Sequence, residues 1–374
     1  MTPRPAARLT ARALGRATLA RQHLLARAES DPADAVRHLV GLQSQVPPNH
    51  YTALWTRLAG FDPEDFSRRF ERREFVRLSL MRCTLHTVTA GDGLALRPLF
   101  DVPHERTLRS NYRKELAGAD PAAVAARARV LLENAGPLEA RELGALLRDE
   151  WPEAAPRTLA MAARQLLPLV QVPPRGLWQR GGAARLTTAQ HWLGAAASAE
   201  PAAKLENLVR RYLAAFGPAS VKDVQRWSGL TRLRLVVDGL RDELVVFRDD
   251  ATGAELFDLP DAPRPDPETP APARFLPEFD NVFIGHDDRS RIIPDPKRHA
   301  VAWSGNVAKP VFLSDGVLKG TWSLLRDGDG ATLELRPFAD LSAAERAGLE
   351  EEGEALLAFH APEAAPAIRW SSWP

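Results

Sequence analysis

The stretch RVLLENAGPLEARELGALL, residues 129–147, is matched in outline by RRYLAAFGPASVKDVQRWS, residues 210–228. Each combines a helix with apolar periodicity, a Gly-Pro pair and a second helix, and Gly136 aligns with Gly217. Glycine suits the left-handed residue that ends a helix, and the proline after it prevents the helix from continuing. Two such segments in one chain predict a repeated architecture.

Both copies continue in the same way. A third helical stretch follows, PRTLAMAARQLLPL (156–169) or TRLRLVVDGLRDEL (231–244), and leads to the short strand LVQV or LVVF. Turn-rich segments with a further strand come next, PPRGLWQR in one copy and DDATGAELFDL in the other. The order of helix, turn, helix, helix and hairpin is the plan of a winged helix-turn-helix.

About 100 residues at the start predict a divergent third copy that lacks the Gly-Pro pair. Helical periodicity runs over 9–27, a second helix opens at Asp31 as its N-cap, and a third covers 50–59. The strand-like FVRLSLMRCTLHTV (75–88) follows.

The rest of the chain favours β structure. Residues 258–274, DLPDAPRPDPETPAPAR, are proline-rich and acidic and predict a linker or a long surface loop. Apolar runs with turns at 314–316 and 327–330 then predict an antiparallel β unit. A last helix over 341–359 opens with the capping box of Ser342 and Glu345.

These patterns predict a mainly α protein with small β elements, of the α+β class. We expect three tandem winged helix-turn-helix units followed by a C-terminal antiparallel β element with a terminal helix. The units are placed at residues 1–115, 116–200 and 201–262, and the C-terminal element at residues 263–374.

Composition narrows the function classes. Apolar residues make up 45% of the 374 residues and charged residues 26%, which is typical of a globular protein. Lys and Arg number 49 against 48 Asp and Glu, so any nucleic-acid surface must come from uneven placement of charge. The one cysteine, Cys83, excludes an internal disulfide and a cysteine-based metal cluster, and its apolar neighbours favour a buried, inert thiol.

Targeting signals are also missing from the sequence. No apolar run approaches the ~18 residues of a membrane span, and no signal-peptide core follows the start. The Arg-rich, acid-poor beginning loosely resembles a transit peptide. We expect no contact with membranes and a cytoplasmic location.

The motifs of several enzyme classes are absent. The sequence contains no phosphate loop, dinucleotide fingerprint, zinc-protease helix or nucleophile elbow. DGDG (327–330) resembles a calcium loop, but Phe338 stands where the bidentate Glu would be, so a hairpin turn is favoured. The nine histidines show no metal-ligand spacing. We therefore expect no metal and no cofactor.

Basic charge collects at two places. One is a stripe that recurs every four residues near the start, and the other lies in and just after the loop GHDDRSRIIPDPKRH (285–299). Each is suited to DNA phosphates, and each is also compatible with an ordinary solvated surface. The two sets are Arg4, Arg8, Arg12 and Arg16, and Arg289, Arg291, Lys297 and Arg298.

The stretch GLQSQVPPNH (41–50) contains two glutamines just before two prolines. Val46 precedes Pro47 and is biased to extended geometry, so the helix from Asp31 is expected to end near Gln43–Gln45. An extended exit lets the two amides point the same way. The alternative is a polar helix end that happens to contain two glutamines.

Three stretches resemble the AlkZ-type DNA glycosylases, a winged-helix family with a catalytic Gln-x-Gln signature. They are HLVGLQSQVPPNHYTALWTRL (38–58), RFLPEFDNVFIGHDDRSRIIP (274–294) and VFLSDGVLKGTWSL (311–324). That family also has three tandem winged-helix units and a C-terminal β element. Ser44 stands where the family usually has an apolar residue. Gln45 agrees with the AlkZ type, since the sister YcaQ type has Asp there.

The resemblance implies a monofunctional DNA glycosylase whose catalytic residues are Gln43 and Gln45. It would hydrolyse the N-glycosidic bond of cationic N7- or N3-alkylpurines in double-stranded DNA, as a monomer, without cofactor, lysine Schiff base or strand cleavage. A cationic purine leaves as a neutral base, so two amides that position water suffice without a strong acid. Members of the family unhook interstrand crosslinks, which residue types do not distinguish from activity on monoadducts. The setting would be bacterial DNA in the nucleoid.

Further roles follow from the same resemblance. His86 and Thr87, in RCTLHTVTA, would line the active site, and the loop HDDRSR would engage DNA. Arg8, Arg12, Arg289 and Arg291 are the residues expected to contact DNA. A winged-helix transcriptional regulator, which needs no catalytic pair, is the main alternative. A DNA-binding module that has lost catalysis is another.

Overall fold

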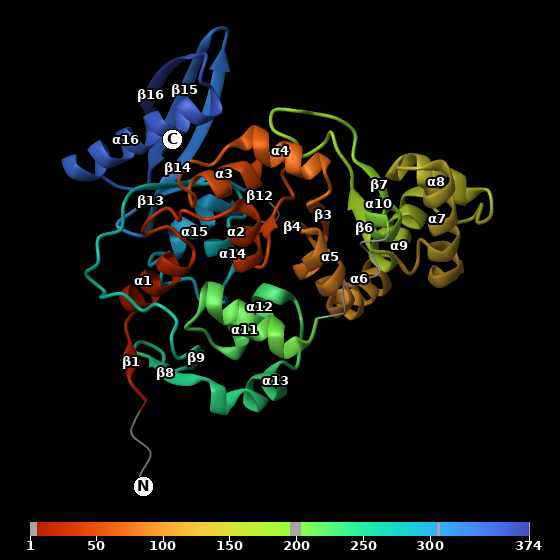
Figure 1. Cartoon of the computed structure of the whole chain (residues 1–374), viewed down its shortest axis with the longest axis horizontal. Coiled ribbons are helices and arrows are strands. Elements are labelled where there is room, and N and C mark those ends of the chain that lie inside the picture. The colour runs from red at the N-terminus through yellow and green to blue at the C-terminus, as the bar shows by residue number, and fades with distance from the viewer. Residues whose placement is uncertain (1–5, 195–202, 305–306, 374) are drawn as a thin grey trace.

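The structure is a computed structural model that describes residues 6–194, 203–304 and 307–373. Arg4 and the expected boundary between residues 200 and 201 lie outside these residues. Helices and strands both contribute, and Figure 1 shows them in several groups around the central helices α2 and α3. Among the described helices, none is long and apolar enough to cross a bilayer.

The second segment has the expected order of elements. Its short strand β5 pairs with β7, the return strand of the hairpin. That return strand begins at Arg185 and not within the turn-rich stretch 173–180, which forms a loop. The elements are α7 (Pro121–Ala135), β5 (Leu138–Glu139), α8 (Ala140–Arg148), α9 (Pro156–Leu166), β6 (Leu169–Gln171) and β7 (Arg185–Thr188).

The third segment repeats this order, and Ala219 bridges to Phe257 at the place of the short strand. Gly217 differs from expectation, because its φ of −61° is not left-handed. A Cβ there would meet Arg21 Nη1 at 2.7 Å and the Leu213 carbonyl at 2.7 Å, so the glycine is required for space. The elements are α11 (Leu205–Phe216), α12 (Val221–Ser228), α13 (Arg234–Gly239), β8 (Val245–Asp249) and β9 (Glu255–Asp258).

The first segment has the same order without a Gly-Pro pair. A two-residue strand follows its first helix and pairs with the second strand of its hairpin. Two more helices, α5 (Ala90–Leu96) and α6 (Asp101–Tyr112), lead to the second segment. The repeated elements are α2 (Pro32–His38), β2 (Leu42–Gln43), α3 (Asn49–Trp55), α4 (Pro63–Glu71), β3 (Phe75–Ser79) and β4 (Leu85–Thr89).

One six-stranded sheet joins the first two segments in the order β2-β4-β3-β6-β7-β5. The two hairpins meet at β3 and β6, where Arg77 opposes Gln171 and Leu78 opposes Val170. The two short strands therefore lie at opposite edges of the sheet. One of these edges carries Gln43.

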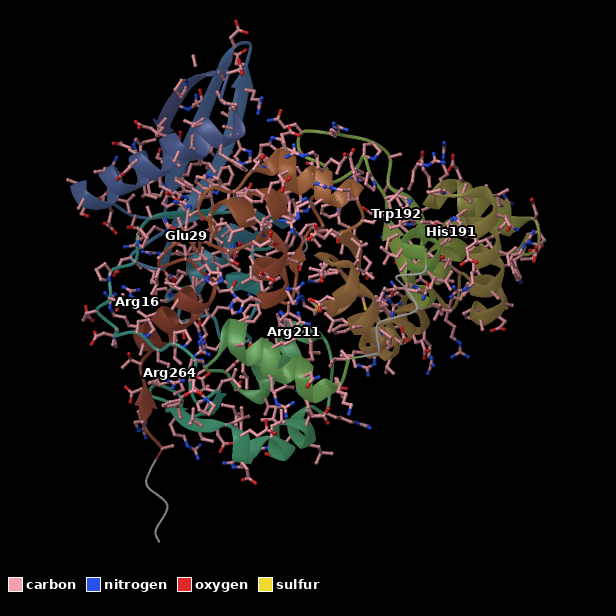
Figure 2. All side chains as sticks on the ribbon, viewed as in Figure 1. Arg16, Glu29, His191, Trp192, Arg211 and Arg264 are labelled. Carbon is pink, nitrogen blue, oxygen red and sulfur yellow. The ribbon has the colours of Figure 1, made fainter. Side chains whose placement is uncertain are left out.

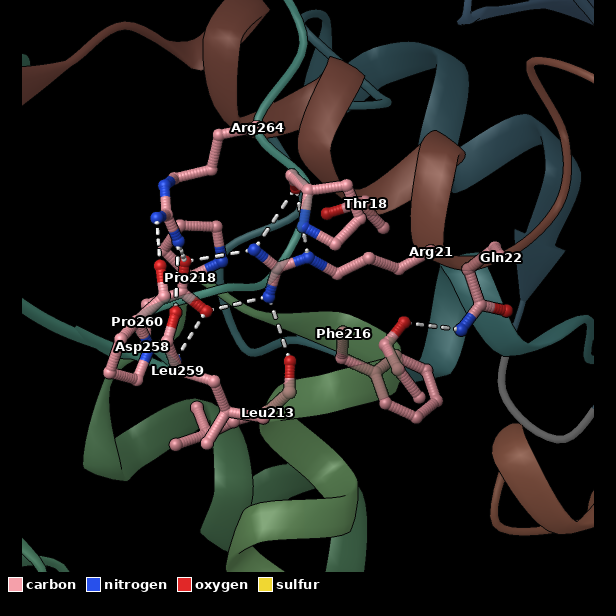
Figure 3. A network of polar contacts seen from close by, with 12 residues as sticks. Thr18, Arg21, Gln22, Leu213, Phe216, Pro218, Asp258, Leu259, Pro260 and Arg264 are labelled. Carbon is pink, nitrogen blue, oxygen red and sulfur yellow. Dashed lines mark hydrogen bonds and ion pairs between the residues drawn. The ribbon is translucent and has the colours of Figure 1, made fainter. Parts of the chain in front are cut away.

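The beginning of the described chain packs on the third segment. Strand β1 (Arg8–Leu9) pairs with β8, and helix α1 (Ala11–Arg21) follows it. At the end of α1 the buried Arg21 donates to Asp258 at 2.6 and 2.8 Å and to the Leu213 carbonyl at 2.8 Å, as Figure 3 shows. Helix α1 is thus tied to the third segment by a buried ion pair.

The proline-rich stretch 258–274 is a loop, as expected, and the protein holds it at several points. Arg264 pairs with Asp258 and donates to the carbonyls of Leu259 and Pro260. Arg16 of α1 donates to the Thr269 carbonyl at 2.6 Å, and Figure 2 shows Arg16 and Arg264 near one another on this side of the molecule. The loop is therefore packed along α1 and is not a free linker.

The C-terminal element contains a five-stranded sheet. Both expected hairpin turns are confirmed, since Ser314 pairs with Val317 and Asp327 with Gly330. The capping box of Ser342 and Glu345 begins α16 (Ala343–His360), also as expected. The sheet is not wholly antiparallel, because β16 runs parallel to β15. Its strands are β10 (Arg274–Leu276), β13 (Val311–Ser314), β14 (Val317–Asp327), β15 (Gly330–Pro337) and β16 (Ala365–Trp370).

Shorter elements complete the described chain. Strands β11 and β12 pair antiparallel with each other after α15. These elements are α10 (Ala189–Leu193), α14 (Asn281–Ile284), α15 (Pro296–Ala302), β11 (Trp303–Ser304) and β12 (Val307–Ala308).

Candidate active site

The turn between α2 and β2 sets the direction of the Gln-x-Gln stretch. Helix α2 ends at His38, earlier than the expected end near Gln43–Gln45, because Val40 (φ 55°) and Gly41 (φ 93°) reverse the chain. The Gly41 amide donates back to the Val36 carbonyl at 2.9 Å and closes the helix end. Pro47 and Pro48 lead into α3 and do not terminate α2. Gln43 therefore lies on an extended strand.

The turn after α2 requires glycine at position 41 for two reasons. Its φ is left-handed, and a Cβ would lie 2.6 Å from Val88 Cγ1. Gly41→Ala is expected to lower the free energy of unfolding by about 1–3 kcal/mol, measured by urea denaturation. Gly60→Ala is the matched control, because Gly60 also has a positive φ (64°) but has no atom near the added Cβ. Equal losses in the two variants would show that packing at Gly41 is unimportant.

Gln43 and Gln45 lie on the same side of this extended stretch. The Ser44 amide donates to the Leu85 carbonyl at 2.9 Å, so pairing with β4 continues one residue beyond β2. Side chains two apart on extended backbone share a face. Gln43 is 8% exposed and Gln45 is open to solvent, whereas Ser44 is fully buried. The glutamine face thus reaches solvent at Gln45, whereas Gln43 is largely buried.

Within the described part of the chain, each amide oxygen has one protein donor. Gln43 Oε1 accepts from Arg82 Nη2 at 2.6 Å, and Gln45 Oε1 accepts from the Leu85 amide at 3.3 Å. A guanidinium and a backbone N–H can only donate, so these contacts identify the oxygen atom of each amide. Each carbonyl oxygen can accept a second hydrogen bond. Both amides are therefore oriented and can still bind a water molecule.

His86 and Thr87 occupy opposite faces of β4. His86 opposes Gln43 in the strand pairing and so lies on the glutamine face. Its Nδ1 is 2.9 Å from the Thr84 carbonyl, which can only accept, so the proton of the neutral ring is on Nδ1. Thr87 opposes Leu42 and is fully buried on the other face. The expectation that Thr87 lines the site therefore needs revision, because its side chain lies behind the strand.

A buried polar layer supports the strand from behind. Thr87 Oγ1 is 3.0 Å from both Ser44 Oγ and His50 Nδ1. Arg77 donates to the Ser44 carbonyl at 2.7 Å, and His50 Nε2 is 3.0 Å from the Gly176 carbonyl. Burial lowers the pKa of His50 well below its usual value, so the ring is neutral in this layer. A serine between the glutamines is thus accommodated by hydrogen bonding.

Burial also lowers the pKa of His86 to about 3, with a further contribution from the charge of Arg82. The unfolded chain therefore binds a proton at His86 first as the pH falls below about 6.5. We expect stability to be lost between pH 6.5 and 3, with up to about 1.4 kcal/mol per pH unit due to this histidine. Urea unfolding of His86→Asn should show a shallower pH dependence in that window. Parallel curves for wild type and variant would contradict the assignment.

Residues 278–281 brace the glutamine stretch from the C-terminal element. Asn281 Nδ2 donates to the Gly41 carbonyl at 3.1 Å, and Asn49 Nδ2 donates to the Glu278 carbonyl at 2.8 Å. The fully buried Arg57 forms a bidentate ion pair with Asp280 at 2.7 and 2.8 Å. The stretch that contains both glutamines is thus held at both ends.

Most of the arginines expected to contact DNA are engaged within the protein. Arg12 pairs with Glu268 at 3.1 Å and with Asp315 at 2.7 Å, and the exposed Arg8 lies 3.7 Å from Asp250. Arg16, in the same stripe, is buried against Asp315. Arg291 is buried and donates to Thr18 and to the Pro218 carbonyl, so it does not reach the surface. Arg12 and Arg16 thus attach α1 to the loop at 258–274 and to the turn at Asp315.

The sequence comparisons agree with this geometry. The family model described as "DNA glycosylase AlkZ-like" matches residues 36–359, which includes the glutamine stretch and its C-terminal brace. The chain belongs to the AlkZ-like DNA glycosylase family. As a member it is an enzyme of the DNA glycosylase class, a hydrolase of base–sugar bonds in DNA.

A curated protein and a solved structure that this AlkZ-like chain resembles both come from Streptomyces sahachiroi. A curated protein named interstrand DNA cross-link repair glycosylase is 25% identical over 360 residues, which is 89% of this chain and 91% of the relative. The solved structure of DNA glycosylase AlkZ superposes with a TM-score of 0.79 at 21% identity and covers 97% of this chain and all of its own. The whole fold, including the C-terminal element, is therefore shared.

Sequence reasoning missed Arg82 in this AlkZ-like site. Arg82 and Cys83 both have positive φ, 53° and 57°, in the tight turn between β3 and β4. That turn brings the guanidinium to Gln43, yet neither residue type signals a left-handed turn. Asp280 and Asn281 lie within the stretch 274–294 that resembles the family, but no motif there indicates their contacts. Their polar character in an apolar run was the available signal of a structural role.

Proposed function

We propose that this chain hydrolyses the N-glycosidic bond of cationic N7- or N3-alkylpurines in double-stranded DNA. The observation that carries the proposal is the pair of oriented amide oxygens, Gln43 Oε1 and Gln45 Oε1, at the end of an edge strand where the exposed Gln45 reaches solvent. Two fixed carbonyl dipoles can hold a water and favour positive charge on a sugar. His86 lies on the same face, and its neutral ring adds no cation there.

The reaction needs no acid from the protein. As the C1′–N bond breaks, its electron pair moves to the alkylpurine, which leaves as a neutral base. The water held by the amides adds its oxygen to C1′ and gives its proton to solvent, because a glutamine amide does not act as a proton acceptor at neutral pH. The product is an abasic site in an intact strand. The chain's own contribution is orientation and electrostatic stabilisation.

The wider architecture supports a DNA-binding enzyme. We assign the three segments that share the order of helix, short strand, helix, helix and hairpin to winged helix-turn-helix units, at residues 1–115, 116–200 and 201–262, with the C-terminal element at 263–374. The exposed Arg8 and the half-buried Arg289 are proposed DNA contacts. Arg12 reaches DNA only by giving up its ion pairs, and Arg291 is assigned a structural role. We propose a monomer that acts in the bacterial cytoplasm, without metal or cofactor.

Interstrand crosslinks are the proposed wider substrate, since the curated relative is named for their repair. The test incubates the protein with an N7-methylguanine duplex and with a duplex crosslinked through two N7-alkylpurines. We expect free base from the first, unhooked single strands from the second, and abasic strands that break only on alkaline treatment. Trapping with borohydride should give no covalent complex. A trapped complex or direct strand cleavage would contradict the monofunctional mechanism.

A further inference from the structure

Arg82 carries a positive charge that the protein leaves without a carboxylate partner. It donates to Gln43 Oε1 and to the Trp227 carbonyl of α12, both neutral acceptors. Over the described residues, no Asp or Glu forms an ion pair with it. The buried Arg21 and Arg57, by contrast, each have a bidentate aspartate. Arg82 is only partly buried, so an anion from outside the chain can reach its guanidinium group.

Two further arginines lie beside it. Arg226 precedes Trp227 on α12 and is exposed, and no carboxylate of the described chain pairs with it. Arg289 lies on the loop after α14. The Asp287 amide of this loop donates to Asp223, in the first turn of α12, at 2.9 Å. The Arg289 guanidinium lies 5.7 Å from the centre of the Trp303 ring. After burial, the charges of Arg226 and Arg289 are the causes that lower the pKa of Arg82, to about 10. The charges of Arg226 and Arg289 thus act on Arg82, which is the arginine that contacts Gln43.

The α12 helix explains how they come together. Its last turn contacts the Arg82 turn, since Gly229 packs against the Arg82 backbone and a Cβ there would lie 3.1 Å from Arg82 Cα. Its first turn contacts the loop of Arg289 through Asp223. The helix therefore spans the distance between the two loops, with Arg226 between its contacts. The carboxylate of Asp287 acts on Arg289 but is already paired with Lys222 at 2.7 Å, so the charges of Arg82 and Arg226 still repel one another.

We propose that Arg82 and Arg226, with Arg289 beside them, bind a phosphodiester of the DNA strand next to the nucleotide that Gln43 and Gln45 act on. The proposal rests on the proposed function. Guanidinium groups match phosphate oxygens in shape and charge and bind them with charge-assisted hydrogen bonds. Because Arg82 also donates to Gln43, the bound phosphate and the orientation of the Gln43 amide share one side chain.

Salt dependence of binding tests the contact itself. The probe is a duplex with a tetrahydrofuran abasic analogue, and affinity is measured by anisotropy over a series of KCl concentrations. Arg226→Ala and Arg82→Ala should each reduce the slope of log affinity against log salt by about 1. Arg82→Lys should keep the slope, because the charge remains. Arg210→Ala is the matched control, since Arg210 is also on the third segment but pairs with Glu243 at 2.8 Å, and its slope should equal that of wild type.

Neutral methylphosphonates placed one at a time along the lesion strand locate the contact. In wild type, one or two adjacent substitutions should weaken binding about tenfold. The same methylphosphonates should have no further effect on binding by the Arg226→Ala variant. Arg226 is exposed, so this variant should keep its hydrophobic core intact. Wild-type slopes in both alanine variants, or a methylphosphonate effect that persists in Arg226→Ala, would overturn the proposal. Both experiments measure DNA binding and not base release, so a negative result for this proposal can be distinguished from a failure of the proposed glycosylase activity.

Discussion

Gln43→Ala and Gln45→Ala are each expected to slow release of N7-methylguanine by about 10²-fold or more under single-turnover conditions. Each amide is oriented by one protein donor, Arg82 Nη2 for Gln43 and the Leu85 amide for Gln45. Alanine removes the fixed dipole together with the water that it holds. Affinity for an abasic-analogue duplex should change little, because neither side chain carries a charge for the phosphates.

A matched substitution separates this effect from general damage. Gln190 is an exposed glutamine on α10, away from β2 in the sheet order, and Gln190→Ala should release base at the wild-type rate. Thermal unfolding of all three variants checks that they remain folded. Wild-type release rates in both Gln43→Ala and Gln45→Ala would remove these residues from the mechanism.

Arg57→Leu is expected to lower the free energy of unfolding by about 3–5 kcal/mol, the largest effect on stability that we predict. Arg57 and Asp280 are both fully buried, and their ion pair joins the end of α3 to the residue that caps α14. Removing the cation leaves the Asp280 carboxylate buried without its partner. Urea denaturation followed by circular dichroism measures the loss.

The double variant Arg57→Leu/Asp280→Asn should recover part of that loss. Asparagine removes the unpaired charge and remains a good N-cap for α14. Arg37→Leu, which breaks the exposed pair with Asp34, should cost no more than about 1 kcal/mol. If the double variant is no more stable than Arg57→Leu, the loss comes from packing and not from an uncompensated charge.

Local sequence signals predicted the repeated segments well. The left-handed Gly136, the capping box at Ser342 and the hairpin turns depend on neighbouring residues, which is why the sequence reveals them. The joining of two hairpins at β3 and β6 depends on pairing between distant segments. The same holds for the pairing of β1 with β8. Such long-range contacts do not change the local periodicity of apolar residues, so the sequence does not predict them.

The candidate site was predicted only in part, because some of its contacts also join segments that are distant in sequence. The two glutamines share a face, although the turn at Val40 and Gly41 creates the extended stretch and the prolines do not. Gly41 stands where the other copies have the glycine of their Gly-Pro pair, so an alignment of the first copy would have found β2. Arg82 reaches the site through a left-handed turn and a contact with α12, 145 positions away in sequence. No local pattern predicts that contact.

The most direct test compares release of a charged and an uncharged purine from otherwise identical duplexes. One duplex contains N7-methylguanine and the other contains hypoxanthine, and free base is quantified under single-turnover conditions. If the amide pair acts only by orienting water and stabilising positive charge on the sugar, N7-methylguanine is released and hypoxanthine is not. Comparable release of hypoxanthine would show that the protein supplies an acid to the leaving base, and would contradict the account.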